Sequence, residues 1–335
     1  MRKRGQTQRY PKEQDIFSNQ ISDARTLNQS RPIRMGLIRG RSGPVSFALA
    51  RLQTATVSNS MARLPLEDNF NDVINKAQRG LKLSDAHLAE RAGISPDELA
   101  ATKAGIINDT VIRRVARPLK LSADALEELA HKRFYPVAPV FSRGFAMFNT
   151  PHGDMTVNSY LIWDCGSRIA AAFDTGADCT AMLDTLAAEH LTLRYVFITH
   201  THDDHIAALP VLAAAAPQAE IWSSELEPVD HPGTKIFKEN AHFHLGELAI
   251  KTLLTSGHSP GLTTFFVTGL SWPLAIVGDS IFSCSMGGSP THYADQLRNN
   301  RDKIIPLPRD SVIAPGHGPL TTLALEKKHN PFFAL

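Results

Sequence analysis

The sequence predicts an α/β domain preceded by a small all-α bundle. Residues 67–134 contain several sequence signals for helix starts and almost none for strands. From residue 135 onward, short apolar strands alternate with helices. A dense group of histidines directly follows one of those strands. A chain of 335 residues is long for one domain, and its 43% hydrophobic content is ordinary for a globular protein. We therefore predict three parts, a basic extension over 1–66, a helical domain over 67–134 and an α/β domain over 135–335.

The net charge of +2 hides an asymmetry along the chain. Residues 1–60 contain 11 basic and 3 acidic residues, a balance of +8, whereas residues 61–335 contain 24 basic and 30 acidic residues, a balance of −6. Residues 1–60 lack periodicity, and their composition is typical of a disordered extension or of a transit peptide. Alternatively, the translation start is placed too early, since Met61 stands just before the first predicted helix. The acidic remainder disfavours RNA or DNA cleavage.

Cysteine usage and hydropathy favour a cytoplasmic protein. The three cysteines are odd in number, scattered, and form no Cys-x-x-Cys motif, so a reducing compartment is expected. No apolar run approaches the roughly 18 residues of a membrane-spanning helix, and the first 30 residues lack the apolar core of a secretory signal. We expect no membrane partner.

Polar residues mark the helix starts of the segment 67–134. Ser84 can cap a helix that ends before the turn at Gly93. The Ser-Pro-Asp-Glu sequence at 95–98 combines an N-cap serine, proline at the first helical position and glutamate at the third, which is a capping box. Two further helices are predicted to open at Asp109 or Thr110 and at Ser122.

Two helices joined by a tight glycine-containing turn form the helix-turn-helix pattern. The run LSDAHLAERAGISPDELAATKAG followed by VARPLKLSADALEELA resembles the repressor-like helix-turn-helix family of the lambda repressor and Cro type. The resemblance implies a DNA partner for residues 67–134. Residues 97–101 offer no Arg, Gln or Asn for base edges, so Thr102 and Lys103 are the expected DNA contacts. A structural or protein-contact role for this bundle is the alternative.

The remaining chain alternates strands and helices. Strands are expected over 158–163, 169–173, 195–198, 219–222, 248–254, 263–268, 274–277 and 311–314. Helices are expected over 179–189, 206–215 and 293–302. This alternation predicts a single α/β domain with an ample core.

The sequence Thr-His-Thr-His-Asp-Asp-His at 199–205 is the most informative segment. It follows an apolar strand and leads into an apolar helix. His200 and His202 are two residues apart, so in an extended segment they point the same way and can hold one ion, while Asp204 and His205 can hold a second. With only 14 histidines in the chain, so dense a cluster is unlike a chance polar loop.

Three single residues are expected to complete this site, because a metal site in an α/β domain is built from several loops at one sheet edge. His258, Asp279 and His317 each follow an apolar strand and are flanked by glycine, which lets the backbone approach an ion closely. By contrast, His242 and His244 precede a turn, and we expect both to be solvated.

Taken in order, THTHDDH, GHSPG, GDS and PGHGP resemble the metallo-β-lactamase fold superfamily and, within it, the glyoxalase II-like hydrolases. The resemblance implies an αββα sandwich of two mixed sheets with a dinuclear centre at one edge. Two divalent metal ions are implied, with zinc expected and iron or manganese as the other candidates. Carried over by position, the first metal would be bound by His200, His202 and His258, the second by Asp204, His205 and His317, and both by Asp279.

The resemblance also implies the chemistry. A hydroxide bridging the metals would attack the carbonyl of a small thioester or ester substrate. Asp204 would be the catalytic residue that orients the hydroxide and passes its proton to the leaving group, and Asp174 would fix a ligand histidine by a hydrogen bond. Only 18 residues follow His317, so the helical domain that binds glutathione in glyoxalase II is not matched.

Two other functions remain open. A persulfide dioxygenase of the same fold would use one iron held by His200, His258 and Asp279. A DNA-binding regulator would use the metal domain to sense a ligand or to form a homodimer. A true β-lactamase is disfavoured because an aspartate, Asp279, occupies the bridging position.

Overall fold

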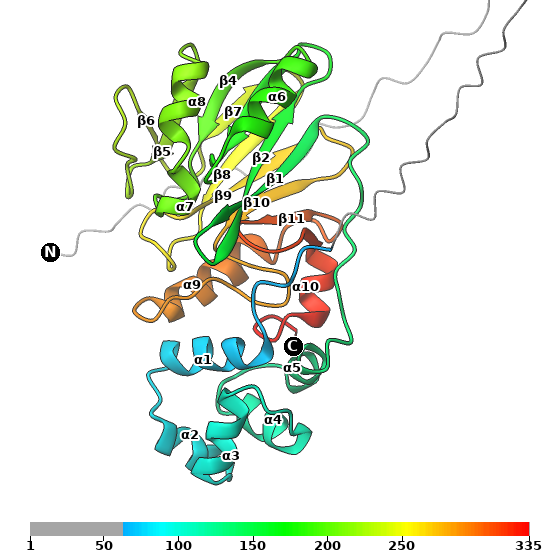
Figure 1. The fold of residues 1–335 in the computed structure, drawn as a ribbon, viewed down its shortest axis with the longest axis vertical. Helices are drawn as coiled ribbons and strands as arrows, with labels where there is room; N and C mark the ends of the chain where they lie inside the picture. The colour runs from blue at the N-terminus through cyan, green and yellow to red at the C-terminus, as the bar shows by residue number, and fades with distance from the viewer. Residues whose placement is uncertain (1–62, 335) are drawn as a thin grey trace, which may run out of the picture. The chain divides into compact units, whose positions relative to one another are not determined.

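A computed structural model describes residues 63–334, so the extension predicted over 1–66 lies almost wholly outside the described residues. The strands form two six-stranded sheets (Figure 1). The first sheet contains, in spatial order, β1 (Phe145–His152), β2 (Met155–Trp163), β3 (Ile169–Phe173), β4 (Thr192–Phe197), β5 (Glu220–Ser224) and β6 (Lys235–Phe237). The second contains β12 (Thr321–Thr322), β11 (Val312–Pro315), β10 (Leu274–Gly278), β9 (Thr263–Thr268), β8 (Leu248–Leu254) and β7 (His242–Leu245).

The two sheets pack face to face because successive apolar residues of a strand point alternately to its two faces, and one face of each sheet covers the other sheet. In β10, Leu274 and Ile276 belong to the core between the sheets, whereas Ala275 and Val277 belong to the cluster on the outer face. Aromatic rings dominate the inner core, with the ring centroids of Phe173 and Phe265 5.2 Å apart across it. Both sheets are mixed. In the first sheet β3 to β6 are parallel while β1 and β2 are antiparallel, and in the second β10 and β11 are parallel while β7 to β10 pair antiparallel.

Helices cover the outer faces of both sheets. On the first sheet, α6 (Thr180–Ala188) and α8 (Leu209–Ala215) share a buried cluster with β2, β3 and β4. On the second, α9 (Tyr293–Asn299) and α10 (Leu323–His329) contribute Tyr293 and Leu323 to the outer cluster. The predicted fold class, an αββα sandwich of two mixed sheets preceded by an all-α segment, is confirmed.

The all-α segment contains α1 (Phe70–Gly80), α2 (Asp85–Ala92), α3 (Pro96–Lys103), α4 (Asp109–Ala116) and α5 (Ala123–Ala130). Ser84 caps α2, and Gly93 ends it with the left-handed φ of +63° that glycine favours. The Ser95 and Glu98 capping box opens α3 as predicted. At α4 the capping side chain is Asn108, one residue before the predicted start.

Several boundaries differ from the prediction. The helix expected over 206–215 is divided into α7 (Asp203–Ile206) and α8, with Pro210 in the first turn of α8. The helix expected over 293–302 becomes α9 followed by a π-helix over Asn300–Ile304. The prediction missed β1, an edge strand that contains Pro151, because proline within a run argues against a central strand.

One continuous hydrophobic cluster joins the all-α segment to the second sheet. Val73 and Ile74 of α1 belong to the same buried cluster as Val277 of β10 and Ile313 of β11. In Figure 1, α9 and α10 lie between the strands and the helices α1 to α5. Within residues 63–334, no helix combines the length and apolar character needed to cross a membrane.

Candidate metal centre

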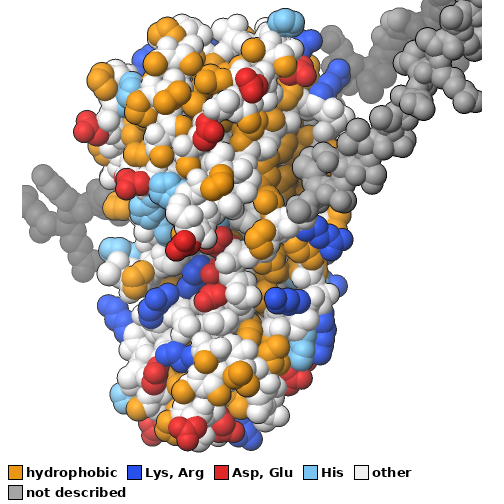
Figure 2. All heavy atoms as spheres, in the orientation of Figure 1, with side chains coloured by type: hydrophobic (Ala, Val, Ile, Leu, Met, Phe, Trp, Pro, Cys, Tyr) orange, Lys and Arg blue, Asp and Glu red, His pale blue; other side chains and the backbone are white. Residues whose placement is uncertain are grey.

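All seven predicted ligand side chains converge at one edge of the two sheets. The segment from His200 to His205 follows β4 and includes α7, while His258, Asp279 and His317 lie in the loops after β8, β10 and β11. Histidine side chains reach the surface beside α7 in Figure 2, and His202 is exposed. The convergence follows from topology, because β8, β10 and β11 run in the same direction within the second sheet, and that sheet packs face to face on the sheet that contains β4.

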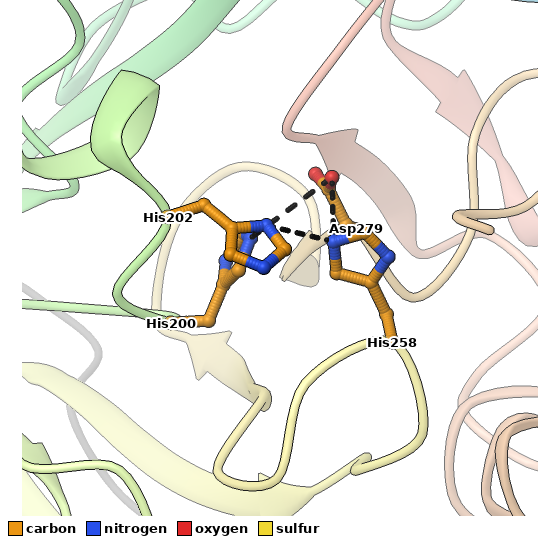
Figure 3. Close-up of side chains that lie close together, drawn as sticks. All are labelled: His200, His202, His258 and Asp279. Atoms are coloured by element: carbon orange, nitrogen blue, oxygen red, sulfur yellow. Dashed lines mark hydrogen bonds and ion pairs between the residues drawn. The ribbon is translucent and has the colours of Figure 1, made fainter. Parts of the chain in front are cut away.

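Three imidazoles and one carboxylate form the first cluster (Figure 3). His202 Nδ1 lies 3.1 Å from His200 Nε2 and 3.0 Å from His258 Nε2. Asp279 Oδ2 lies 3.3 Å from His258 Nε2 and 4.0 Å from His200 Nε2. Four donor atoms therefore face a common point, as ligands of one metal ion do.

The second cluster consists of Asp204, His205 and His317. Asp204 Oδ2 lies 3.3 Å from His317 Nε2 and 3.6 Å from His205 Nε2. Asp279 connects this cluster to the first, because its Oδ1 lies 3.4 Å from His205 Nε2 and its Oδ2 lies 3.6 Å from His317 Nε2. A single carboxylate thus faces both groups of ligands.

Hydrogen bonds fix which ring nitrogen of each ligand faces the centre. The carbonyl of Gly288 accepts from His258 Nδ1 at 2.7 Å, and the carbonyl of Thr156 accepts from His317 Nδ1 at 2.7 Å. A carbonyl can only accept, so each Nδ1 carries its proton and each Nε2 is left to bind a metal.

Two buried atoms at the centre have no hydrogen-bond partner among the described residues. They are His205 Nε2 and Asp279 Oδ1, which face each other. Gly316 leaves the space beside them, because a Cβ there would lie 2.2 Å from Asp279 Oδ1. Unsatisfied buried polar atoms are costly, so this arrangement fits bound cations.

The electrostatics of the centre also favour cations. Burial lowers the pKa of His205, but the carboxylates of Asp174 and Asp279 outweigh burial and raise this pKa to about 10. Burial likewise lowers the pKa of His317, but Asp204 and Asp279 raise it to about 11. The carboxylates therefore require positive charge at the centre, carried by protons on the two imidazoles or by metal ions.

Comparison with known proteins agrees with the fold. Residues 152–317 match the family model of the metallo-beta-lactamase superfamily. The match covers 166 of the 335 residues, and this part of the chain is similar to that superfamily.

The similarity to two named relatives covers most of the length of each relative. The probable metallo-hydrolase YqgX of Bacillus subtilis is 28% identical over 204 residues, which are 54% of this chain and 94% of the relative. The hydroxyacylglutathione hydrolase GloC of Haemophilus influenzae is 28% identical over 198 residues, 52% of this chain and 92% of the relative. A solved metallo-beta-lactamase of Staphylococcus aureus is 24% identical with a TM-score of 0.51, covering 58% of this chain and 65% of that structure, and shows likeness of fold.

Asp174 is not one of the seven predicted ligands, and it lies beside a ligand histidine as the sequence predicted. Its Oδ2 accepts from His205 Nδ1 at 2.8 Å, so the expected hydrogen bond to a ligand histidine is present. Asp174 is buried and has a φ of +55°, a conformation that aspartate adopts more readily than most residues. The bond leaves His205 Nε2 facing the centre.

Glu227 is a residue of this site that the sequence reasoning missed. Its Oε1 accepts from the backbone N and the hydroxyl of Thr201, at 2.8 and 2.9 Å. Its Oε2 accepts from Ser259 Oγ at 2.6 Å and from Gly261 N at 2.8 Å. One carboxylate therefore ties the loop that carries His200 and His202 to the loop that carries His258. The sequence around Glu227 contains no motif that signals this role.

The structure corrects one predicted contact and bears out another expectation. Thr102 is 1% exposed and its hydroxyl donates to the Glu98 carbonyl, so the prediction that it contacts DNA is wrong. Lys103 remains partly exposed, with its ammonium 2.6 Å from Asp85 Oδ1. His242 and His244 are exposed on β7, away from both clusters, which confirms that they are solvated.

Proposed function

We propose that this chain is a dinuclear metal-dependent hydrolase of the glyoxalase II-like type, acting on a small thioester or ester. The observation that carries the proposal is the position of Asp279, whose two oxygens lie 3.3 to 3.6 Å from His258, His205 and His317. A carboxylate shared between two groups of histidines is what a two-metal site requires. The names of the two relatives, a probable metallo-hydrolase and a hydroxyacylglutathione hydrolase, support the reaction class.

The ligand assignment follows the two clusters, with Asp279 common to both. Five histidines and two aspartates supply nitrogen and oxygen donors, a set suited to zinc, with iron and manganese as alternatives. When bound, two such ions would supply a hydroxide near neutral pH and polarise the substrate carbonyl. The first ion would be held by His200, His202 and His258, and the second by Asp204, His205 and His317.

Asp204 is the residue best placed to handle a proton. Its side chain is 13% exposed, against 7% for Asp279, so it borders the solvent side of the centre. In the proposed reaction Asp204 would orient the attacking hydroxide, take up its proton and pass that proton to the leaving thiolate or alkoxide. Asp174 and Glu227 act through the ligands, by fixing His205 and the two ligand loops.

A cavity of about 620 Å³ beside His258 offers room for a small-molecule substrate. Its walls come from the loop after β8 and from α9 and the π-helix. The lining includes His292, Arg298 and Lys303, and the charges of the last two are paired with Asp295 and Glu239. A polar lining of this kind suits a small polar acyl compound better than an extended apolar chain.

The test combines metal content with a substrate screen on one preparation. We expect two metal ions per chain, hydrolysis of at least one thioester or lactone in a panel that also contains β-lactams, and loss of that hydrolysis in His202→Ala. The matched control is His244→Ala, since His244 is exposed on β7 and belongs to neither cluster. Two bound metals without activity on any thioester or lactone of the panel would contradict the thioester or ester assignment.

The two alternative functions give different results in the same experiment. One iron per chain together with oxygen consumption would replace the hydrolase by a persulfide dioxygenase. Tight binding of genomic DNA at moderate salt, without hydrolysis, would indicate a regulator with a metal-binding sensor. The start of α3 gives that last function little support, because Asp97 and Glu98 occupy it and Thr102 is buried.

A further inference from the structure

We propose that α1 is part of the metal centre, and that Lys76 on this helix is a positioning residue for ligands of both clusters. This inference rests on the proposed function, since it concerns the same metal site. Lys76 lies in the all-α segment, outside the residues that match the superfamily model. It contacts the loop after Asp279 at two points.

The first contact is a buried polar network. Lys76 Nζ donates to the carbonyl of Met286 at 3.0 Å and to the carboxylate of Asp68. Asp68 Oδ2 also accepts from Ser285 Oγ at 2.6 Å. The side chains of Lys76 and Asp68 are 14% and 8% exposed, and Ser285 is fully buried. Such a pair is held rigidly, because moving either partner would leave a buried charge without compensation.

This network reaches the first cluster through the next two residues of the loop. Gly287 packs so closely that a Cβ there would lie 2.1 Å from the Asp279 carbonyl and 3.1 Å from His258 Nδ1. Gly288 supplies the carbonyl that accepts from His258 Nδ1 at 2.7 Å. The position of the Met286 backbone therefore determines whether His258 keeps its proton on Nδ1 and its Nε2 toward the metal.

The second contact reaches the other cluster through an aromatic ring. Lys76 Nζ lies 5.0 Å from the centroid of the Phe282 ring, a cation–π distance. The Phe282 ring meets the His317 ring edge to face, with centroids 5.5 Å apart. His317 is a ligand of the second cluster, so one ammonium group supports ligands on both sides of Asp279.

The residues before α1 pack against the loop that carries His317. A Cβ at Gly318 would lie 3.3 Å from Glu67 N and 3.5 Å from the Pro65 carbonyl. The chain before α1 therefore packs beside the residue that follows His317. These contacts place α1 and the residues before it against the loop after Asp279 and the loop that carries His317. A separate DNA-binding module would not need such contacts.

The experiment measures zinc affinity by competition with a chelator, with circular dichroism to monitor folding. We expect Lys76→Met to weaken zinc binding at least tenfold, the usual effect of losing a group that orients a metal ligand, and Lys76→Arg to restore part of the loss. Ser285→Ala removes only the hydroxyl that donates to Asp68, so it tests the same network without leaving a charge unpaired. We expect a smaller weakening of the same kind.

The control is Lys103→Met, which removes the exposed ion pair with Asp85 in the same helical segment. It should leave zinc affinity unchanged, whatever it does to the melting temperature. Zinc affinities within twofold of the unaltered protein in both Lys76→Met and Ser285→Ala would overturn the inference, even if both variants melt earlier. If the unaltered protein itself binds none of zinc, iron and manganese, the proposed function fails instead.

Discussion

Asp174 accepts a hydrogen bond from His205 Nδ1 at 2.8 Å, and its two oxygens also accept from the backbone N and the hydroxyl of Thr199, each at 2.8 Å. Asp174→Asn keeps an acceptor for Thr199 N but turns an amide NH₂ toward His205 Nδ1. The imidazole can then accept from that NH₂ only with its proton on Nε2, the nitrogen that faces the second cluster.

We therefore expect Asp174→Asn to reduce metal affinity at the second cluster about 10- to 100-fold. Metal analysis after dialysis should give close to one ion per chain instead of two. Asp178→Asn is the control, because Asp178 is exposed and bonds only to Thr180 among the described residues. Two tightly bound ions in Asp174→Asn would show that the tautomer of His205 does not depend on this carboxylate.

Glu227 should control the first cluster in a similar way. Glu227→Ala removes the acceptor of four hydrogen bonds that join the Thr201 and Ser259 loops, so His202 and His258 lose their fixed separation. We expect metal affinity at the first cluster to fall about tenfold or more, with Glu227→Gln intermediate. Chelator competition measures this loss. Equal affinity in Glu227→Ala and in Glu225→Gln, a variant of an exposed neighbour, would refute the role.

The space at Gly316 should be essential to the centre. In Gly316→Ala the new methyl group would lie 2.2 Å from Asp279 Oδ1 and 2.7 Å from His205 Cε1, so one of these two groups must move. We expect loss of the second metal ion and a large fall in kcat. Gly166→Ala is the control, because Gly166 is exposed, lies outside the centre, and a Cβ there would come no closer than 3.5 Å to its nearest neighbour, Asp164 Oδ2. Full activity in Gly316→Ala would mean that the ligands tolerate displacement.

Glu326 should make folding stability depend on pH. Burial raises its pKa from 4.5 to about 7, against the hydrogen bonds from Thr321, Asn330 and Cys284 that lower it. Between these values the folded state holds a proton that the unfolded state releases, so the stabilising contribution is complete below about pH 4.5 and is lost as the pH rises to about 7.

Glu326→Gln should remove this dependence, because a glutamine does not titrate. Denaturant unfolding at pH 5 and pH 8, with metal removed from both proteins, should show the free energy of unfolding of the unaltered protein falling by up to about 3 kcal/mol more than that of the variant. Identical pH profiles for the two proteins would place the pKa of Glu326 near its ordinary value.

The ligand residues could be predicted from the sequence because each lies shortly after an apolar strand, and the two packed sheets bring those strand ends to a common edge. His200, His258 and His317 are examples of this local signal. Glu227 and Lys76 could not be found in this way. Glu227 bonds to residues 26 to 34 positions away, and Lys76 bonds to a carbonyl 210 positions away, so only the folded chain brings these partners together.

The DNA contact predicted at Thr102 failed for a related reason. Helical spacing places a residue on a face, but tertiary packing decides which face is covered, and Thr102 is buried in the helical segment. The capping residues of α2 and α3 were predicted correctly because an N-cap acts within four residues of its own helix.

The buried cluster shared by Ile74 of α1 and Ile313 of β11 has a consequence for how the protein unfolds. Apolar surface that two segments bury against each other is exposed when either one melts, so the free energies of the two segments are coupled. Residues 63–334 should then unfold in one cooperative calorimetric transition. Limited proteolysis should yield no stable fragment that contains the sandwich without the helices α1 to α5.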